Sequence, residues 1–425
     1  MLGGNNLFKM KKILILLLFV FAIGLIVGCG SDHGEENDGE DLSHNETTDN
    51  GETQETVSGE EVSHSSGGLL HLNTKNVTRL NSNDAFEISV MTSQMIWPAT
   101  HTANQPGTIM LAPIENWQLA LASLNLVHHP NDGPLLFTDN GVIPDLVLAE
   151  IERLHPKGNV EGTQIMVMGT LNDGELDKLG DFEVVVVEEE EAAAFALEID
   201  RLYGELTNNI PSSVIVGSME EKGKKFTIPV GSWITHMDEP LLYVTENEVP
   251  EATVKALEKR EGAASIYVVG PESIISNEVL EQLNHFGDVI RISGETPADL
   301  AVEFAKYRDY DTNFGWEVVS PGHGLVMVST EFPELAITAA PFAHLGKHAP
   351  MVWLDEGKFT EEMHIYLEQL KPTFENEPTE GPYNHAYLIG GEDLVPFKVQ
   401  GFIDEMLEIV PASGGGHGDH GAHGH

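Results

Sequence analysis

The only cysteine of this 425-residue chain, Cys29, lies in a setting that points to a chemical modification. Basic residues precede an apolar stretch, Ile13 to Val27, that is short for a membrane span and has the length of a signal-peptide core. The stretch runs into Gly28-Cys29 and resembles the lipobox of bacterial lipoproteins. We therefore expect a signal peptide at 1–28, a lipid on Cys29 and an extracytoplasmic body anchored to the cell membrane. The alternative is an uncleaved N-terminal anchor in which the cysteine has no special role.

A second chemically suggestive group is the C-terminal tail, which carries His417, His420, His423 and His425. Imidazoles bind Zn²⁺, Ni²⁺ or Cu²⁺, and a short histidine-rich tract can wrap such an ion. The intervening glycines provide no preorganised geometry. The tail is therefore either a weak metal-binding segment or a plain solvated tail.

Other histidines are weaker candidates. His344 and His348 have the i, i+4 spacing that places metal ligands on one helix face, but Pro350 follows closely and should end a helix there. We interpret them as surface or turn residues. His128 and His129 precede Pro130 and are interpreted as part of a loop.

No catalytic or cofactor motif is recognisable. Three apolar segments end in glycine, at Gly169, Gly270 and Gly390, where a tight turn is a simpler explanation than a phosphate cradle. Neither a Gly-x-Ser-x-Gly elbow nor a nucleotide-binding glycine motif occurs. We therefore predict a protein that is not an enzyme and requires no cofactor.

The charge restricts the partners. With 22 Lys and Arg against 68 Asp and Glu, the formal net charge is −46, which repels nucleic acid and anionic lipid headgroups. Residues 29–68 are acidic, polar and almost free of apolar side chains, so they cannot bury enough surface to fold. We expect this segment to be a disordered tether.

The rest of the chain contains a repeat. A proline-led apolar strand, a polar turn and an amphipathic helix occur three times, at domain-sized intervals, around Pro134, Pro240 and Pro350. Each copy is followed by one of the strands that end in glycine, and further strands alternate with helices around them. This alternation predicts parallel sheets with right-handed crossovers.

The predicted fold class is α/β, with three tandem Rossmann-like or flavodoxin-like three-layer modules. The boundaries proposed from the sequence are 69–182, 183–288 and 289–411, followed by a histidine- and glycine-rich tail at 412–425. The sequence does not decide whether the helix after Val187 closes the first module or opens the second.

Several segments resemble the cell wall-binding repeat 2 family. Val289-Ile-Arg-Ile-Ser-Gly-Glu295 is similar to its opening strand, Leu325 to Ile337 to its next strand and helix, and Tyr387-Leu-Ile-Gly-Gly391 to its strand ending in two glycines. The resemblance covers roughly residues 77–410 in three copies. It implies Rossmann-like modules in a three-fold arrangement that attach proteins non-covalently to anionic wall polymers and catalyse nothing.

The repeats also depart from that family. The helix start carries Asn116 in the first copy and Lys225 in the second, where the third keeps an acid, Glu334. The acidic body also argues against direct capture of an anionic polymer unless divalent cations bridge the two. The predicted function is that of a membrane-anchored surface lipoprotein that binds a cell-envelope component such as a wall polymer. The alternative is a divalent-metal-binding lipoprotein that uses its histidine tail.

Overall fold

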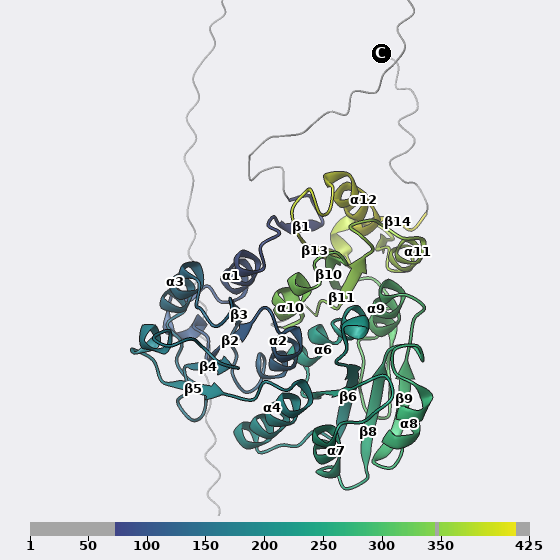
Figure 1. The fold of residues 1–425 in the computed structure, drawn as a ribbon. Coiled ribbons are helices and arrows are strands. Elements are labelled where there is room, and N and C mark those ends of the chain that lie inside the picture. The colour runs from purple at the N-terminus through teal and green to yellow at the C-terminus, as the bar shows by residue number, and fades with distance from the viewer. Residues whose placement is uncertain (1–72, 345–347, 414–425) are drawn as a thin grey trace, which may run out of the picture. The chain divides into compact units, whose positions relative to one another are not determined.

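The computed structural model describes residues 73–344 and 348–413 (Figure 1). These residues all belong to the second of the two units into which the chain divides, which begins at Ser65. The predicted signal peptide and tether, Cys29 and the four tail histidines lie outside the described residues. No helix in the described part is long and apolar enough to cross a membrane.

Three four-stranded sheets share one strand order: three strands follow one another along the chain, the first of these lies between the other two, and a fourth strand lies at one edge. The first sheet, in the order β3-β2-β4-β5, contains β2 (Ile109–Pro113), β3 (Leu135–Thr138), β4 (Ile165–Met168) and β5 (Val184–Val187). The second, in the order β7-β6-β8-β9, contains β6 (Ser213–Ser218), β7 (Leu241–Val244), β8 (Ala264–Val269) and β9 (Gly287–Ile292). The third, in the order β1-β13-β10-β11, contains β1 (Val77–Leu80), β10 (Gly324–Ser329), β11 (Met351–Leu354) and β13 (His385–Ile389).

Helices connect the strands and cover the sheets. They are α1 (Ala85–Ile96), α2 (Trp117–Ser123), α3 (Asp145–Leu154), α4 (Ala192–Thr207), α5 (Lys224–Thr227), α6 (Val230–His236), α7 (Glu251–Glu258), α8 (Asn277–Leu283), α9 (Pro297–Lys306), α10 (Glu334–Ala339), α11 (Glu361–Gln369) and α12 (Phe397–Leu407). Short 3₁₀ helices include η3 (Leu124–Leu126) and η6 (Ala340–Ala343). A small extra sheet pairs β12 (Thr373–Phe374) with β14 (Val410–Pro411).

The predicted α/β fold class is confirmed. The proline-led segments form β3, β7 and β11, the glycine-ended segments form β4, β8 and β13, and the strand pairs of the three large sheets are all parallel. The six segments are almost wholly buried, as expected for strands covered by helices on both faces. Gly169, Gly270 and Gly390 have φ of 97°, 142° and 122°, so each makes the tight turn that only glycine adopts without strain.

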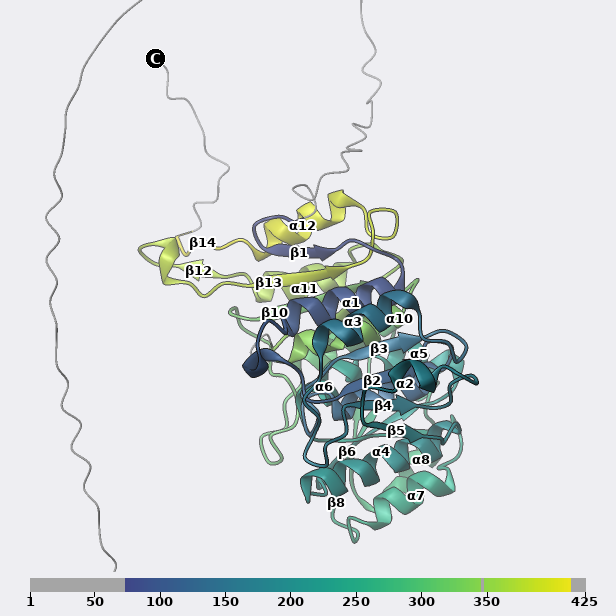
Figure 2. The same ribbon diagram turned by 90° about the vertical axis from the view of Figure 1, so that its left-hand side faces the viewer.

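Each repeat begins with an opening strand, which is β1, β5 or β9. This strand does not pair with the strands that follow it in the sequence. Instead β5 lies at the edge of the first sheet and β9 at the edge of the second. The third sheet is completed by β1, the first strand of the described chain, which pairs with β13 from Val77↔Ala386 to Leu80↔Ile389. Figures 1 and 2 both show β1 beside β13. The order of strands is therefore closed into a ring by a contact between the two ends of the described body.

The helix after each opening strand packs against the next sheet. After β5, α4 contacts β7 and α7; after β9, α9 contacts β11; and after β1, α1 contacts β3. Each strand–helix pair therefore joins two neighbouring sheets. This arrangement explains why local sequence could not assign the segment around Val187 to one module.

Buried arginines hold two of the opening strands in place. Arg79 in β1 is 4% exposed and donates to the carbonyl oxygens of Gly390 and Val395 at 2.8 and 2.7 Å, and to Gln400 Oε1 at 2.7 Å. Arg291 in β9 makes the matching bonds to the carbonyls of Gly270 and Ile275, at 2.7 and 2.8 Å. Burial lowers the pKa of Arg79 to about 10, so the side chain stays charged at neutral pH.

The third residue of β3, β7 and β11 is a buried aromatic side chain, and those in β7 and β11 bond to a neighbouring repeat. Phe137, Tyr243 and Trp353 are all at most 1% exposed. The Tyr243 hydroxyl donates to the carbonyl of Gln118 in α2 at 2.7 Å, and Trp353 Nε1 donates to the carbonyl of Lys225 in α5 at 2.9 Å. Since donor and acceptor come from different repeats, these bonds set the orientation of one sheet on the next.

Candidate functional site

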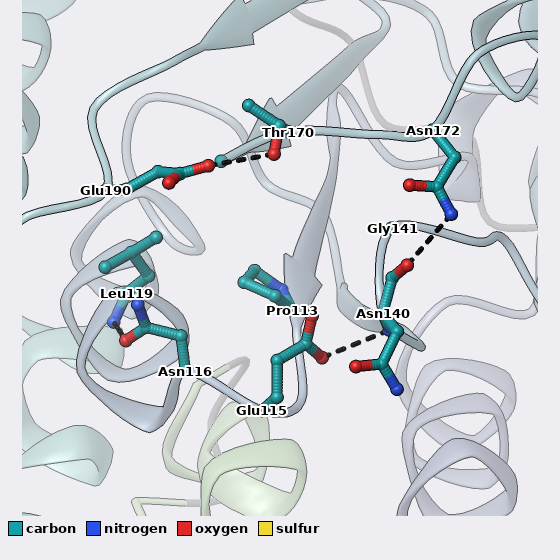
Figure 3. A pocket seen from close by; sticks show the side chains of 10 residues that line it. Pro113, Glu115, Asn116, Leu119, Asn140, Gly141, Thr170, Asn172 and Glu190 are labelled. Carbon is teal, nitrogen blue, oxygen red and sulfur yellow. Dashed lines mark hydrogen bonds between the residues drawn. The ribbon is translucent and has the colours of Figure 1, made fainter.

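A cavity lined by polar side chains lies at the carboxyl end of the first sheet. From β2 the chain crosses to β3 on one side, whereas β4 is followed by β5 on the other. The loops after β2 and β4 therefore diverge, which leaves the crevice where open α/β sheets bind their ligands. A cavity of about 400 Å³ occupies this point, and we call it the switch-point cavity (Figure 3).

Loops from all four strands of the sheet supply its lining. The β2 loop supplies Glu115 and Asn116, the β3 loop Asn140, the β4 loop Thr170 and Asn172, and the β5 loop Glu190. The volume lies within the range of about 300–1,000 Å³ typical of small-molecule sites.

Hydrogen bonds tie these loops to one another around the cavity. Glu115 Oε2 accepts from the backbone N–H of Asn140 at 3.3 Å, and Asn172 Nδ2 donates to the carbonyl of Asn140 at 3.0 Å. The Thr170 hydroxyl donates to Glu190 Oε1 at 2.8 Å. Figure 3 shows these contacts forming a partial ring around the cavity. The lining is therefore held in place before any ligand arrives.

Gly141 is required where the β3 and β4 loops meet. It has φ of 76°, and a Cβ at this position would lie 2.8 Å from Asn172 Oδ1. Asn116 has a different structural task, because its Oδ1 accepts from the backbone N–H of Leu119 at 3.3 Å and caps α2. Its amide nitrogen donates no hydrogen bond to any described residue, so it remains available to a ligand.

The ionisable residues of the lining are acidic. Glu115 and Glu190 are carboxylates, and among the described residues no lysine, arginine or histidine lines the cavity. The corresponding loops of the second sheet differ: Lys222 pairs with Glu246 there, and Glu220 accepts from the Glu246 backbone N–H at 2.8 Å. The repeats therefore share a fold without sharing one binding chemistry.

A second cluster lies where the three repeats meet. His128, His236 and His344 occupy equivalent positions, 108 residues apart, after η3, α6 and η6. The ring centroids of His128 and His344 are 3.9 Å apart and those of His128 and His236 are 6.3 Å apart. His129 stacks on His128 at 4.2 Å, and His348 packs edge-on against His236 at 4.3 Å.

The environment of this cluster favours neutral imidazoles. Burial, followed by the neighbouring imidazoles, lowers the pKa of His236 to about 4, and burial also lowers the pKa of His128. His128 Nδ1 donates to the carbonyl of His236 at 2.8 Å, which fixes its tautomer. His344 Nε2 lies 3.8 Å from Asp132 Oδ1, and this contact holds the pKa of Asp132 below its usual value.

The positions of the predicted histidines differ in part from expectation. His344 lies in a turn, as predicted, but it is buried at 5% exposure and not on the surface. His348 is exposed in a left-handed backbone conformation, with φ of 47°. Within 73–344 and 348–413, no three His, Cys, Asp or Glu side chains are arranged so that they could hold a metal ion. The ring contacts of the histidine cluster pack the repeats against one another.

Sequence reasoning missed both the cavity and the role of His236. The signal for the histidines was present, because the same residue type recurs at one interval after the same helix. The cavity had no such signal: its polar residues follow four different strands and are common surface types. Only the strand order brings them together.

Comparison with known proteins supports the fold assignment. No protein-family model matches the chain, and no curated protein matches it significantly. Among solved structures, Cwp6 from Clostridium difficile matches 78% of this chain and 48% of its own, with a TM-score of 0.63 and 16% identity. Cwp8 from the same organism matches 79% of this chain and 52% of its own, with a TM-score of 0.58 and 18% identity. The chain spans about half the length of these two proteins, and its body has the fold that they share.

Proposed function

We propose that this chain is a non-catalytic surface lipoprotein, held to the membrane by a lipid on Cys29, whose three-sheet body binds a cell-envelope component such as a wall polymer. The body is the binding part, and the acidic segment before it is the tether.

The observation that carries the proposal is the likeness of the body to two cell wall proteins of C. difficile over more than three quarters of the chain. The three-fold sequence resemblance to the cell wall-binding repeat 2 family covers the same region and agrees with it. The lipobox-like segment before Gly28-Cys29 adds an independent argument for export.

Binding fits the switch-point cavity better than catalysis does. The described residues of its lining include no histidine, cysteine or lysine that could act as a nucleophile or as a base near neutral pH. Its carboxylates are engaged in holding the loops, Glu115 with the Asn140 backbone and Glu190 with the Thr170 hydroxyl. Fixed polar groups around an open cavity are typical of a recognition site.

Co-sedimentation with purified cell-wall sacculi tests the proposal. The full chain carrying Cys29→Ser, which removes the lipid, should sediment with sacculi, whereas an unrelated protein of similar acidity should stay in solution. The assay should be run from low to high salt, with and without Ca²⁺, because a chain of charge −46 is repelled by an anionic wall at low salt. Failure to sediment under every condition would overturn wall binding.

A further inference from the structure

We propose that the switch-point cavity binds a hydroxyl-rich sugar unit that carries no acidic group, and that it binds an amino sugar best. The inference rests on the proposed function, since it names the kind of envelope component that the body holds.

The first argument is the kind of polar group in the lining. Sugar hydroxyls both donate and accept hydrogen bonds, and they need partners of both kinds. The cavity offers as a donor the amide nitrogen of Asn116, which donates no hydrogen bond to any described residue. It offers Glu115 Oε1 and Glu190 Oε2 as acceptors, since the hydrogen bonds that these carboxylates make with described residues use their other oxygens.

The second argument is charge. A phosphate or a sugar carboxylate would bring a negative charge next to Glu115 and Glu190, and no basic side chain in the lining would compensate it. Like charges in one cavity repel each other, and the net charge of −46 adds to this repulsion. A protonated amine has the opposite sign and gains charge-assisted hydrogen bonds from the same two carboxylates.

The third argument is preorganisation. The loops after β2, β3 and β4 are already joined through Asn140 and Asn172, and the β5 loop is joined to the β4 loop through Thr170. A site whose loops are fixed loses little entropy when a ligand binds. The cavity of about 400 Å³ has room for a sugar unit together with its water molecules.

The test is calorimetry with three probes on the full chain carrying Cys29→Ser: a glucosamine oligosaccharide, its N-acetylated counterpart and a glycerol-phosphate polymer. We expect the glucosamine probe to bind tightest, the N-acetylated probe more weakly, and the phosphate polymer not at all at this cavity. Chelation with EDTA should leave the order unchanged. Equal or tighter binding of the N-acetylated probe would overturn the pairing of an amine with the carboxylates, and an order that depends on Ca²⁺ would overturn direct recognition.

Matched variants locate the site. Glu115→Gln and Glu190→Gln keep the shape and the loop contacts but remove one charge each, so glucosamine binding should weaken about three- to tenfold while binding of the N-acetylated probe changes less than about twofold. Glu281→Gln, in exposed α8, makes the same charge change elsewhere and should alter neither. Melting curves confirm that each variant is folded.

The outcomes separate the two proposals. If the chain sediments with sacculi but no sugar probe binds, or if phosphate-polymer binding responds to Glu115→Gln, this inference is wrong and wall binding stands. If the chain does not sediment with sacculi under any condition, the proposed function fails whichever probe the cavity binds.

Discussion

The imidazole rings of His128 and His344, from the first and third repeats, lie against each other with their centroids 3.9 Å apart and their planes tilted by 39°. His236, from the second repeat, completes the group. Three equivalent residues thus meet where the repeats contact one another, with His344 buried and His128 and His236 partly buried. Protonation of these imidazoles is disfavoured, because each added charge is poorly solvated and repels the charges of its neighbours.

The free energy of unfolding should therefore fall as pH falls from about 6.5 to about 4. The folded-state pKa of His236 is about 4 and that of His128 is also lowered, whereas an unfolded histidine titrates near 6.5. In this window the unfolded chain binds more protons than the folded one, so acid favours unfolding. Urea denaturation at pH 7, 5.5 and 4.5 measures the loss. After discounting for partial exposure, His236→Asn should reduce that loss by about 1–2 kcal/mol.

Glu239 has the opposite effect on the pH dependence of the free energy of unfolding, so it needs its own control. Burial raises its pKa to about 7, so its folded state binds a proton more readily, and this contribution favours the folded state as pH falls through 7 toward 4.5. Glu239→Gln should therefore make the acid loss steeper. His285→Asn, at an exposed histidine after α8, should leave it unchanged. An equal pH dependence in wild type and His236→Asn would contradict the role given to the cluster.

Replacing Arg79 should weaken the third sheet. Arg79→Met keeps the length of the side chain but leaves the carbonyls of Gly390 and Val395 and the amide of Gln400 without this donor, at a cost of about 2–4 kcal/mol. Arg291→Met removes a similar but less buried set of bonds and should cost about half as much. Urea denaturation compares the two variants. Equal effects would show that burial of Arg79 does not strengthen its contribution.

Removing one hydroxyl tests the contact between the first and second repeats. Tyr243→Phe deletes the bond to the Gln118 carbonyl without opening a large cavity and should cost about 0.5–1.5 kcal/mol. The equivalent Phe137 is the natural reference, because it fills the same position in β3 without a hydroxyl. Thermal unfolding measures the change. An unchanged melting temperature would mean that the hydroxyl of Tyr243 contributes nothing to the stability of the folded state.

Removal of residues 414–425 tests the metal-binding alternative. If His417, His420, His423 and His425 bind Zn²⁺ or Ni²⁺, calorimetry on the full chain should show binding near pH 7.5 that disappears in the truncated chain and weakens below about pH 6, where imidazoles are protonated. Binding that survives truncation would place the metal elsewhere, and no binding in either chain would reject this function.

The anchor is tested by Cys29→Ser in the native host. We expect the wild-type chain in the membrane fraction and the variant in the medium or in the wall fraction, because the variant has no thiol to carry the lipid. Metabolic labelling with a fatty acid provides the matching chemical readout. A variant that stays in the membrane would favour an uncleaved N-terminal anchor.

The sequence was sufficient for the strands and their direction because they are short apolar runs with strong local markers. A proline precedes β3, β7 and β11, and a glycine ends β4, β8 and β13. Such markers act within a few residues and need no knowledge of the rest of the chain. The strand β6 was not identified, because Ser213–Ser218 begins and ends with serine, Pro211 lies two residues before the strand and Gly217 lies inside it.

The pairing of strands that are far apart in the sequence could not be predicted from such local markers. The position of Arg79 next to Leu388 is set by pairing across more than 300 residues, and nothing local distinguishes that partner from a strand of the same repeat. In the first sheet, Val186 takes the corresponding register position opposite Val167. The opening strand of the second repeat, β5, therefore has a valine where β1 and β9 have an arginine, although it pairs in the same register.

The pairing of β1 with β13 has a mechanical consequence. If the body is held to the cell by its N-terminal end, any pull reaches β1 before it reaches another strand. The first and second sheets are each built from one continuous segment, 109–187 and 213–292, and do not contain that strand. Tension would therefore detach β1 and open the third sheet first, while the first sheet and its cavity would stay intact.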